Sequence, residues 1–350
     1  MSLQATIAKT LLKLPAGWLV KLSGGKPVEI GGRTLDPHFQ FLAHGAKDQP
    51  PMSSLSAQDG RAASAAGLAM FAAKPEPGVS WDDFEINERS RKIPVRLYRP
   101  EAQDAGAPMM VFYHFGGGVI GDLETCHAFC TMIASTARCP VLSVDYRLAP
   151  EHKWPAGLED CEAAYHWALK HAGEYRAPAG EAAIGGDSMG GNFAAIIAQE
   201  ARRQGWPTPR LQLLIYPAID VSQPSPSHET YGETYPLSTD TMNWFMGHYI
   251  PEDADRADPR ISPGQEMDLS DLPPAIVATA GFDPLVDEGE AYARRLEAAG
   301  VDTIFKCYDA LAHGFTAFTG VSPAADAACR EIAGLVARVY AETAPAEAQS

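Results

Sequence analysis

One stretch in the middle of the chain, residues 183–192, constrains the fold more than any other. It consists of the residues AIGGDSMGGN, and it lies between a short apolar run and a longer one at residues 193–198. This pattern predicts a β-strand, a sharp turn and an α-helix. At the turn lies Gly186-x-Ser188-x-Gly190, a spacing in which a serine at a strained turn projects its hydroxyl above a sheet. Taken alone, the pentapeptide fits an ordinary strand–helix loop equally well.

Strand and helix patterns alternate over most of the chain. A hairpin is expected over 82–88 and 93–99, and apolar runs typical of buried strands follow at 109–115, 140–146, 182–186, 211–216, 274–280 and 302–308. Helical patterns lie near 123–137, 156–171, 189–204, 285–299 and 324–341. Such alternation is typical of crossover units, so we expect the α/β class, with a mostly parallel sheet and helices on both faces.

Two segments depart from this alternation. Residues 34–73 show helical spacing without strands, with a predicted helix cap at Ser56. Residues 218–265 are rich in Pro, Ser and Asp and contain a helical pattern over 239–249. We expect this second segment to be an insertion above the carboxyl ends of the strands, where open α/β sheets bind ligands. Four of its residues at helical spacing are candidates for the lining of a site, with cap core as the equal alternative: Trp244, Phe245, Met246 and Tyr249.

Charge and cysteine content exclude several classes of partner. The formal net charge is −16, which makes nucleic acid and anionic membranes poor partners overall. The six cysteines form no C-x-x-C pair, which favours reduced thiols and a cytoplasmic location. The apolar runs near the N-terminus are short, so no stable membrane insertion is expected. Instead, a basic amphipathic helix is predicted to pack on the protein, with contact to a lipid surface as the less favoured alternative. Its apolar side would hold Leu11, Leu12, Trp18, Leu19 and Leu22.

Ser188 needs a base, and the base needs an acid that orients it. His313 follows the strand at 302–308, and Asp283 follows the strand at 274–280. Asp287 and Glu288, one helical turn further, are the rival acids. Each residue alone fits an ordinary loop or helix cap. Together, however, they follow strand ends in the order Ser–Asp–His that one class of hydrolytic triads uses.

A glycine loop after the strand at 109–115 completes the pattern. Residues 114–121 are HFGGGVIG, and consecutive glycines let a backbone approach a substrate carbonyl closely. No Lys-Ser/Thr pair follows and the G-x-G-x-x-G spacing is absent, so a phosphate-binding loop is not expected. We expect neither a cofactor nor a metal ion.

These motifs resemble the hormone-sensitive-lipase-like (bacterial family IV) esterases of the α/β-hydrolase fold. The resemblance covers roughly residues 34–341. It rests on four stretches: 114–121, 145–156, 186–192, and the pair Asp283-Pro284-Leu285 and His313-Gly314-Phe315. It implies an eight-stranded, mostly parallel sheet flanked by helices under a helical cap. The implied activity is hydrolysis of short- to medium-chain carboxylic esters without a cofactor.

The resemblance also implies roles for individual residues. Ser188, Asp283 and His313 would form the triad, and the backbone N–H groups of Gly116, Gly117 and Met189 would form the oxyanion hole. His114 would anchor the glycine loop, while Arg147 and Glu151 would tie loops together below the site.

Three residues depart from the family pattern. Phe115 occupies the place of the first glycine, Gly118 the place of an aromatic residue, and Met189 the place of an alanine. The unchanged spacing from His114 to Gly121 indicates substitution and not insertion. At Gly118 we therefore expect a more open pocket than in relatives.

From these observations we divide the chain into three parts. Residues 1–80 are an N-terminal extension with cap helices, 81–217 and 266–350 form the α/β-hydrolase catalytic domain, and 218–265 are a cap insertion. The predicted function is that of a serine carboxylesterase acting on a small-molecule ester. An amidase or carbamate hydrolase with the same triad is an alternative, and a non-catalytic small-molecule-binding protein is a more distant one. A homodimer is left open.

Overall fold

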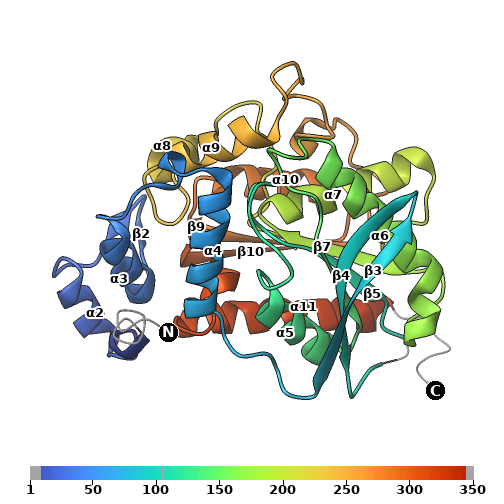
Figure 1. Cartoon of the computed structure of the whole chain (residues 1–350), viewed down its shortest axis with the longest axis horizontal. Coiled ribbons are helices and arrows are strands. Elements are labelled where there is room, and N and C mark those ends of the chain that lie inside the picture. The colour runs from blue at the N-terminus through green and yellow to red at the C-terminus, as the bar shows by residue number, and fades with distance from the viewer. Residues whose placement is uncertain (1–8, 105, 344–350) are drawn as a thin grey trace.

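An eight-stranded sheet forms the centre of the protein. In the computed structural model, which describes residues 9–104 and 106–343, the strand order is β10-β9-β8-β7-β5-β6-β4-β3 (Figure 1). The strands are β3 (Val79–Glu88), β4 (Arg91–Pro100), β5 (Met109–Tyr113), β6 (Val141–Val144), β7 (Ala182–Asp187), β8 (Gln212–Ile215), β9 (Ala275–Phe282) and β10 (Thr303–Ala312). In this sheet the pairs β3–β4 and β4–β6 are antiparallel and the other five pairs are parallel. The predicted eight-stranded, mostly parallel sheet is confirmed.

The apolar runs of the sequence form the middle of this sheet. Every residue of β5, β6, β7, β8 and β9 is buried, as expected for strands covered on both faces. The edge strand β3 instead exposes most of its residues. The buried strands share one direction, so their carboxyl ends meet at one edge of the sheet, and the residues that follow them gather there.

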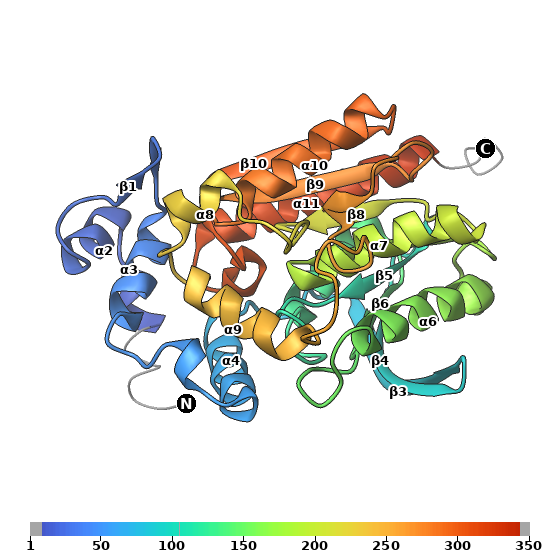
Figure 2. The same cartoon turned by 90° about the horizontal axis from the view of Figure 1, so that it is seen from above.

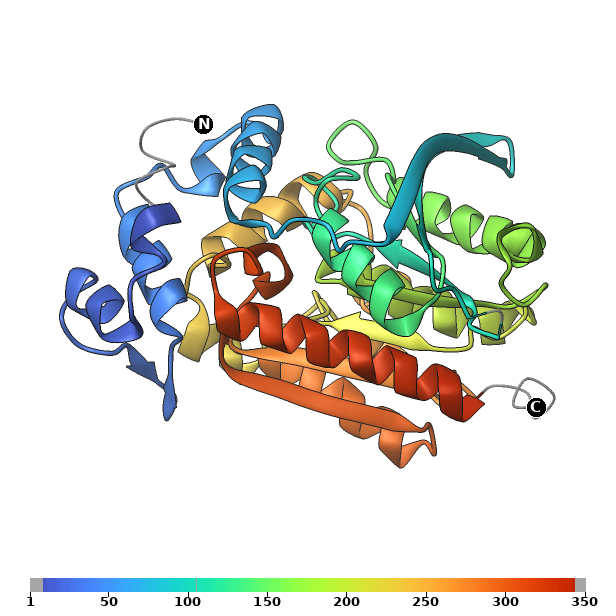
Figure 3. The ribbon, with the colours of Figure 1, turned by 90° about the horizontal axis from the view of Figure 1, so that it is seen from below.

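Helices cover both faces of the sheet. Helices α5 (His127–Ala137) and α11 (Pro323–Thr343) pack together on one face (Figure 3). Helices α6 (Ala156–His171), α7 (Met189–Gln204) and α10 (Val286–Ala298) lie on the other face (Figure 2). Two short 3₁₀ turns, η2 (Ala172–Tyr175) and η4 (Phe315–Phe318), complete the body.

The N-terminal segment folds into short elements beside the body. They are α2 (Ala16–Leu22), the two-stranded pair β1 (Glu29–Ile30) and β2 (Arg33–Thr34), α3 (Pro37–Ala46), η1 (Met52–Ser54) and α4 (Ala57–Phe71). The Ser56 side chain accepts a hydrogen bond from the N–H of Asp59, so the predicted helix cap is confirmed. Part of the predicted basic segment, residues 1–8, lies outside the described residues.

The predicted apolar side of the N-terminal helix is only partly right. Leu12 and Leu19 are buried against the protein, whereas Trp18 and Leu22 are 55% and 46% exposed. Pro15 is the N-cap residue of α2 and interrupts the predicted helix. Because α2 begins only after Pro15, the apolar residues before and after it do not share one helix face.

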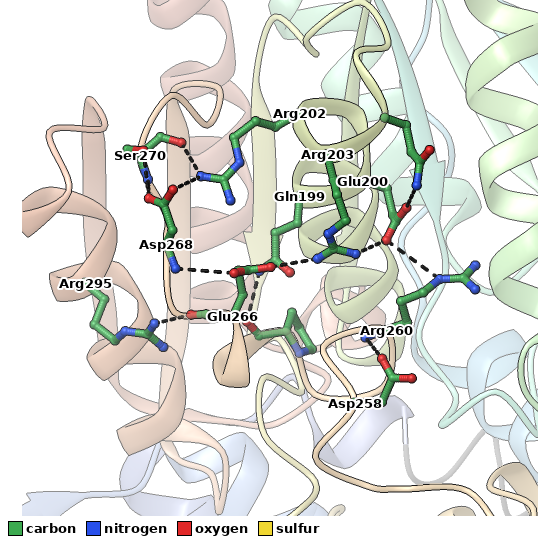
Figure 4. A network of polar contacts seen from close by, with 12 residues as sticks. Gln199, Glu200, Arg202, Arg203, Asp258, Arg260, Glu266, Asp268, Ser270 and Arg295 are labelled. Carbon is green, nitrogen blue, oxygen red and sulfur yellow. Dashed lines mark hydrogen bonds and ion pairs between the residues drawn. The ribbon is translucent and has the colours of Figure 1, made fainter.

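The segment between β8 and β9 contains α8 (Pro226–Tyr231), α9 (Thr239–Tyr249) and η3 (Pro263–Gln265). Figure 2 shows α8 and α9 beside α3 and α4 at one end of the sheet. The chain then returns to the body along α7, where ion pairs hold it (Figure 4). Arg203 of α7 pairs with Glu266 at 2.7 Å, and Arg202 pairs with Asp268 at 3.1 Å.

No helix in the described part of the chain is both long and apolar enough to cross a membrane. All six cysteines carry free thiols, and five of them are buried.

Candidate active site

Ser188 sits on a strained turn between β7 and α7. Its backbone angles are φ +56° and ψ −116°, a conformation that side chains rarely adopt. A Cβ on Gly190 would overlap the carbonyl oxygen of Tyr113, and a Cβ on Gly186 would overlap the backbone of Gly190. The two glycines of the sequence pattern are thus required by backbone contacts.

The structure brings the three predicted triad residues into contact. The Nε2 of His313 lies 2.9 Å from the Oγ of Ser188, and its Nδ1 lies 2.7 Å from Oδ2 of Asp283. Asp283 is fully buried, and its other oxygen accepts a hydrogen bond from the N–H of Leu285 at 2.9 Å. A buried carboxylate in this position fixes the imidazole tautomer that leaves Nε2 free to take a proton from Ser188.

Within the described residues, no hydrogen bond or ion pair joins His313 to either rival acid. The N–H of Asp287 donates to Ser227, on α8. The Oε1 of Glu288 accepts hydrogen bonds from the N–H groups of Ile219 and Asp220. Asp283 is therefore the acid that contacts His313.

The glycine loop adopts backbone conformations that favour glycine. Gly116, Gly117 and Gly118 have φ values of +130°, +62° and +72°. The N–H groups of Val119 and Ile120 both donate to the carbonyl of Gly116, which closes a tight turn. Within the described residues, the N–H groups of Gly116, Gly117 and Met189 make no hydrogen bond to another group. Three unpaired donors next to Ser188 can stabilise an oxyanion.

The expectation of an open pocket at Gly118 is wrong. A Cβ on Gly118 would overlap the ring of Tyr249, and one on Gly117 would overlap the ring of Phe245. Both aromatic residues come from α9, so this helix fills the space that a loop aromatic would occupy. Gly118 faces Tyr249 and is absent from the lining of the cavity, whereas Phe115 is part of that lining.

His114 contacts the glycine loop as predicted, whereas in the described part of the chain Arg147 and Glu151 join their own segment to helices α6 and α4 and not to another loop. The Nδ1 of His114 donates to the Phe115 carbonyl at 2.7 Å, and its ring stacks on Tyr146 at 4.2 Å between centroids. Burial lowers the pKa of His114 to about 4, so it is neutral at ordinary pH. Arg147 forms a bidentate pair with Asp160, at 2.8 Å for both contacts.

A cavity of about 1150 Å³ opens over Ser188 and His313. Its walls come from the glycine loop, from α4, and from the segment between β8 and β9. Apolar side chains dominate beside the triad, among them Leu68, Phe71, Leu237, Phe245, Met246 and Phe318. Of the four predicted lining residues, Phe245 and Met246 line the cavity. Trp244 instead donates to the Leu55 carbonyl and joins α9 to the N-terminal helices.

Sequence reasoning missed a buried polar cluster below the triad. Asp187 accepts hydrogen bonds from Thr316 at 2.7 Å and Tyr216 at 2.9 Å, and Cys126 lies 3.4 Å away. Burial raises the pKa of Asp187, while these hydrogen bonds act in the opposite direction. The ring of Tyr216 also lies 4.7 Å from that of His313. The one signal was the Asp in Gly-Asp-Ser; its partners lie on distant segments.

Among the residues that the structure describes, no group of three His, Cys, Asp or Glu side chains is arranged to hold a metal ion. The polar groups beside Ser188 are the imidazole, the buried carboxylate and the loop N–H groups. These groups serve nucleophilic catalysis at a carbonyl.

Comparison with known proteins agrees with this geometry. A family model described as the alpha/beta hydrolase fold matches residues 110–317. The chain therefore belongs to the α/β-hydrolase fold family and, within it, to the hormone-sensitive-lipase-like group.

Individual relatives match over most of their length. The chain is 43% identical over 303 residues to the carboxylic ester hydrolase LipN of Mycobacterium tuberculosis, covering 84% of this chain and 80% of LipN. It is 37% identical over 281 residues to an ethyl acetate hydrolase of Pseudomonas putida, covering 79% and 88% of the two chains. Among solved structures, the ester-hydrolase EH1AB1 from the metagenome of Lake Arreo, complexed with a bipyridine phosphonate derivative, superposes with a TM-score of 0.80. That protein is 40% identical, and the match covers 85% of this chain and 94% of the other.

Proposed function

We propose that this carboxylic ester hydrolase is a serine esterase that cleaves short- to medium-chain esters through an acyl-enzyme intermediate. The contact series from Ser188 through His313 to buried Asp283 is the observation that carries the proposal. The relatives named as hydrolases of carboxylic esters and of ethyl acetate support the choice of substrate class.

Each group has a role in two successive half-reactions. The Oγ of Ser188 attacks the ester carbonyl carbon while Nε2 of His313 takes the hydroxyl proton. The N–H groups of Gly116, Gly117 and Met189 stabilise the negative charge on the carbonyl oxygen. His313 then gives its proton to the departing alcohol. In the second half, His313 takes a proton from water as the water oxygen attacks the acyl-enzyme carbonyl carbon. His313 then returns this proton to the Oγ of Ser188 as the acid departs.

The segments around the cavity act as its cap in this proposal. Residues 1–80 and 218–265 are assigned to the cap and its extension, and 81–217 with 266–350 to the catalytic domain. The apolar lining contributed by Leu68 and Phe71 of α4 suits an acyl chain or an apolar alcohol. Aliphatic parts of the substrate gain about 0.8 kcal/mol per buried methylene group.

The same triad would also accept an amide or a carbamate. An ester is preferred because the named relatives are hydrolases of carboxylic esters and ethyl acetate. A purely binding role is disfavoured because His313 keeps both of its contacts.

A cytoplasmic location belongs to the proposal, supported by the free thiols. The homodimer left open by the sequence is tested by light scattering, which returns 37.5 kDa for one chain and twice that mass for two.

The proposal is tested on Ser188. Ser188→Ala should lower kcat on a chromogenic butyrate ester by about 10⁴-fold or more and leave the melting temperature near that of the wild type. A fluorophosphonate should label the wild type at Ser188, as read by mass spectrometry of peptides. Persistent turnover in the alanine variant, or labelling of another residue, would refute the mechanism.

A further inference from the structure

The glycine loop needs support from outside itself. Three successive residues with positive φ are held in a shape that places unpaired N–H groups beside Ser188. An oxyanion hole works only when its donors are fixed before the reaction begins. Free glycines, however, have more backbone freedom than any other residue. Neighbouring segments must therefore hold the loop in this shape.

One of these neighbouring segments follows β6 and contains Ala149. The N–H of Ala149 donates to the carbonyl of Gly118 at 2.8 Å. Within the loop, the N–H of Val119 donates to the carbonyl of Gly116 at 2.9 Å. The carbonyls of Val119 and Ala149 thus belong to the two segments that fix the glycines.

Both of these carbonyls accept hydrogen bonds from Arg61, a residue of cap helix α4. Its Nε donates to the Val119 carbonyl at 2.8 Å, and its Nη2 donates to the Ala149 carbonyl at 2.7 Å. The remaining donors form a bidentate pair with Glu151, at 3.0 and 2.6 Å. This pairing lowers the pKa of Glu151 to about 2. The side chain of Arg61 is 29% exposed, and its hydrogen bonds go to Val119, Ala149 and Glu151.

The rigid fork of a guanidinium suits this task. It can meet two carbonyls and a carboxylate at once, whereas the single ammonium of a lysine cannot reach the three acceptors in the same geometry. Apart from Arg61, α4 is loosely packed, with only Ala57 and Gly60 buried among its 15 residues. Arg61 is therefore a main polar connection between this helix and the loops of the active site.

We propose that Arg61 is a positioning residue for the oxyanion hole, through which docking of cap helix α4 fixes the catalytic glycine loop. The proposal rests on the proposed ester hydrolysis at Ser188. It assigns to the cap a part in catalysis in addition to its part in substrate selection. Arg61 touches neither substrate nor triad and acts only through Val119 and Ala149.

The test separates transition-state stabilisation from stability and substrate binding. Arg61→Gln should lower kcat on a chromogenic butyrate ester about 10- to 100-fold, less than the loss of a whole oxyanion donor, while KM stays within threefold. The affinity for a trifluoromethyl ketone should fall by a similar factor. With that ketone, Ser188 Oγ adds to the carbonyl carbon and the resulting oxyanion occupies the hole. Added ethylguanidinium should restore part of the kcat of Arg61→Ala.

Two further variants locate the effect. Glu151→Gln removes the ion pair and leaves the two carbonyl contacts, so its kcat should stay within threefold. Arg330→Gln removes an exposed arginine of α11 that pairs with Asp326 and Glu76, and it should change nothing measured here. Melting curves show that each variant is folded.

The proposal is overturned if Arg61→Gln keeps kcat within threefold of the wild type. It is also overturned if Glu151→Gln loses as much as Arg61→Gln, because the ion pair would then carry the effect. Either result leaves ester hydrolysis intact. A wild type that matches Ser188→Ala in activity would instead refute the proposed function.

Discussion

Two helices that form walls of the same cavity differ sharply in how they are held. Helix α7, which begins after Ser188, has 13 of its 16 residues buried. Helix α4, in the N-terminal segment, has two of 15 buried. Both contribute to the lining of the cavity, α7 through Met189 and α4 through residues such as Leu68.

The contacts of α7 are directional along its whole length. Near its start, the Nδ2 of Asn192 donates to the carbonyls of Ala218 and Ile261 at 2.7 and 2.9 Å. Near its end, Arg202 and Arg203 hold the returning chain through ion pairs (Figure 4). Helix α4 has few such bonds beyond those of Arg61.

This difference in packing corresponds to a difference in role. The well-packed elements position the groups that make and break bonds, and α4 takes part in the selection of the substrate. Groups that exchange protons or hold charge lie on elements whose backbone cannot shift, because a small displacement of a catalytic group costs about 10²-fold in rate. Side chains that meet the rest of the substrate lie on a helix that can adjust. Changes on the α7 side should therefore lower the rate for every ester, and changes at the cavity-lining residues of α4, Arg61 being a separate case, should alter the preference among esters.

We expect the largest effect from adding a methyl group to α7, the well-packed helix. Gly190→Ala places a Cβ on the Tyr113 carbonyl oxygen, at the end of β5 where the glycine loop begins. Backbone cannot yield as a flexible side chain does, so we expect a loss of about 1–3 kcal/mol or more in the free energy of unfolding. We also expect kcat to fall by about 100-fold on acetate and on octanoate esters alike. Denaturant titration and steady-state kinetics measure the two quantities.

Gly67→Ala is the matched change on α4. A Cβ at Gly67 meets nothing within 4 Å, although the residue lines the cavity. Replacing a partly exposed helical glycine gains about 0.5–1 kcal/mol, and kcat on acetate should stay within twofold. If Gly67→Ala and Gly190→Ala lowered kcat and the free energy of unfolding equally, α4 would be as rigid as α7. The proposed difference between the two helices would then be wrong.

The sequence predicted the rigid side well because its signals are local. Fully buried strands appear as unbroken apolar runs, so the central strands lie within a few residues of their predicted positions. The triad residues follow strand ends, and parallel strands bring those ends together. One strand end was missed: β10 continues to Ala312, past an irregularity in its pairing with β9 between Tyr308 and Ala312. Such irregularities carry little sequence signal.

The features that were missed depend on contacts between distant segments. Tyr249 fills the space at Gly118, and the two residues are joined only by the fold. Asp187 is held by Tyr216 and Thr316 from two other strand ends. Arg61 lies in an Ala-rich helical pattern that does not indicate which groups its side chain will contact. The periodicity of one segment does not indicate which residues of a distant segment will contact it.

A bulky side chain on α4 should change the preference among esters without lowering the rate for all of them, unlike a change on α7. Leu68→Trp adds volume to the cavity wall at a residue that lines the site. The ratio of kcat/KM for octanoate to that for acetate should fall by about tenfold or more, since each methylene that loses its burial costs about 0.8 kcal/mol. Activity on acetate should change little. Ala66→Trp, at an exposed position of the same helix, is the control and should leave the ratio unchanged. A uniform loss on all esters would contradict the separation of roles.

Helix α10, packed on the same face of the sheet as α7, contains a buried acid that forms no ion pair within the described residues. Glu288 of α10 has Oε1 bonded to the N–H groups of Ile219 and Asp220, while its Oε2 has no partner in the described residues. Burial raises its pKa to about 8, with Asp283 and Asp220 acting in the same direction and the two backbone hydrogen bonds opposing them. The unfolded chain keeps the ordinary value of about 4.3.

The smallest expected effect follows from this difference in pKa. Below pH 4 the carboxyl is protonated in both states and costs nothing. As pH rises from about 4.3 to 8, the unfolded chain loses the proton while the folded protein keeps it, so the free energy of unfolding decreases across this window and levels off above it. Glu288→Gln keeps an oxygen for the two N–H groups and does not titrate. Its melting temperature should match the wild type near pH 4 and exceed it by roughly 2 °C or more at pH 8, since about 1 kcal/mol shifts the midpoint by a few degrees. A constant difference between the variant and the wild type at both pH values would mean that Glu288 is not protonated in the folded protein. The wall of the cavity would then hold a buried negative charge beside Asp283. This well-packed part of the protein would tolerate an unpaired charge that its packing does not indicate.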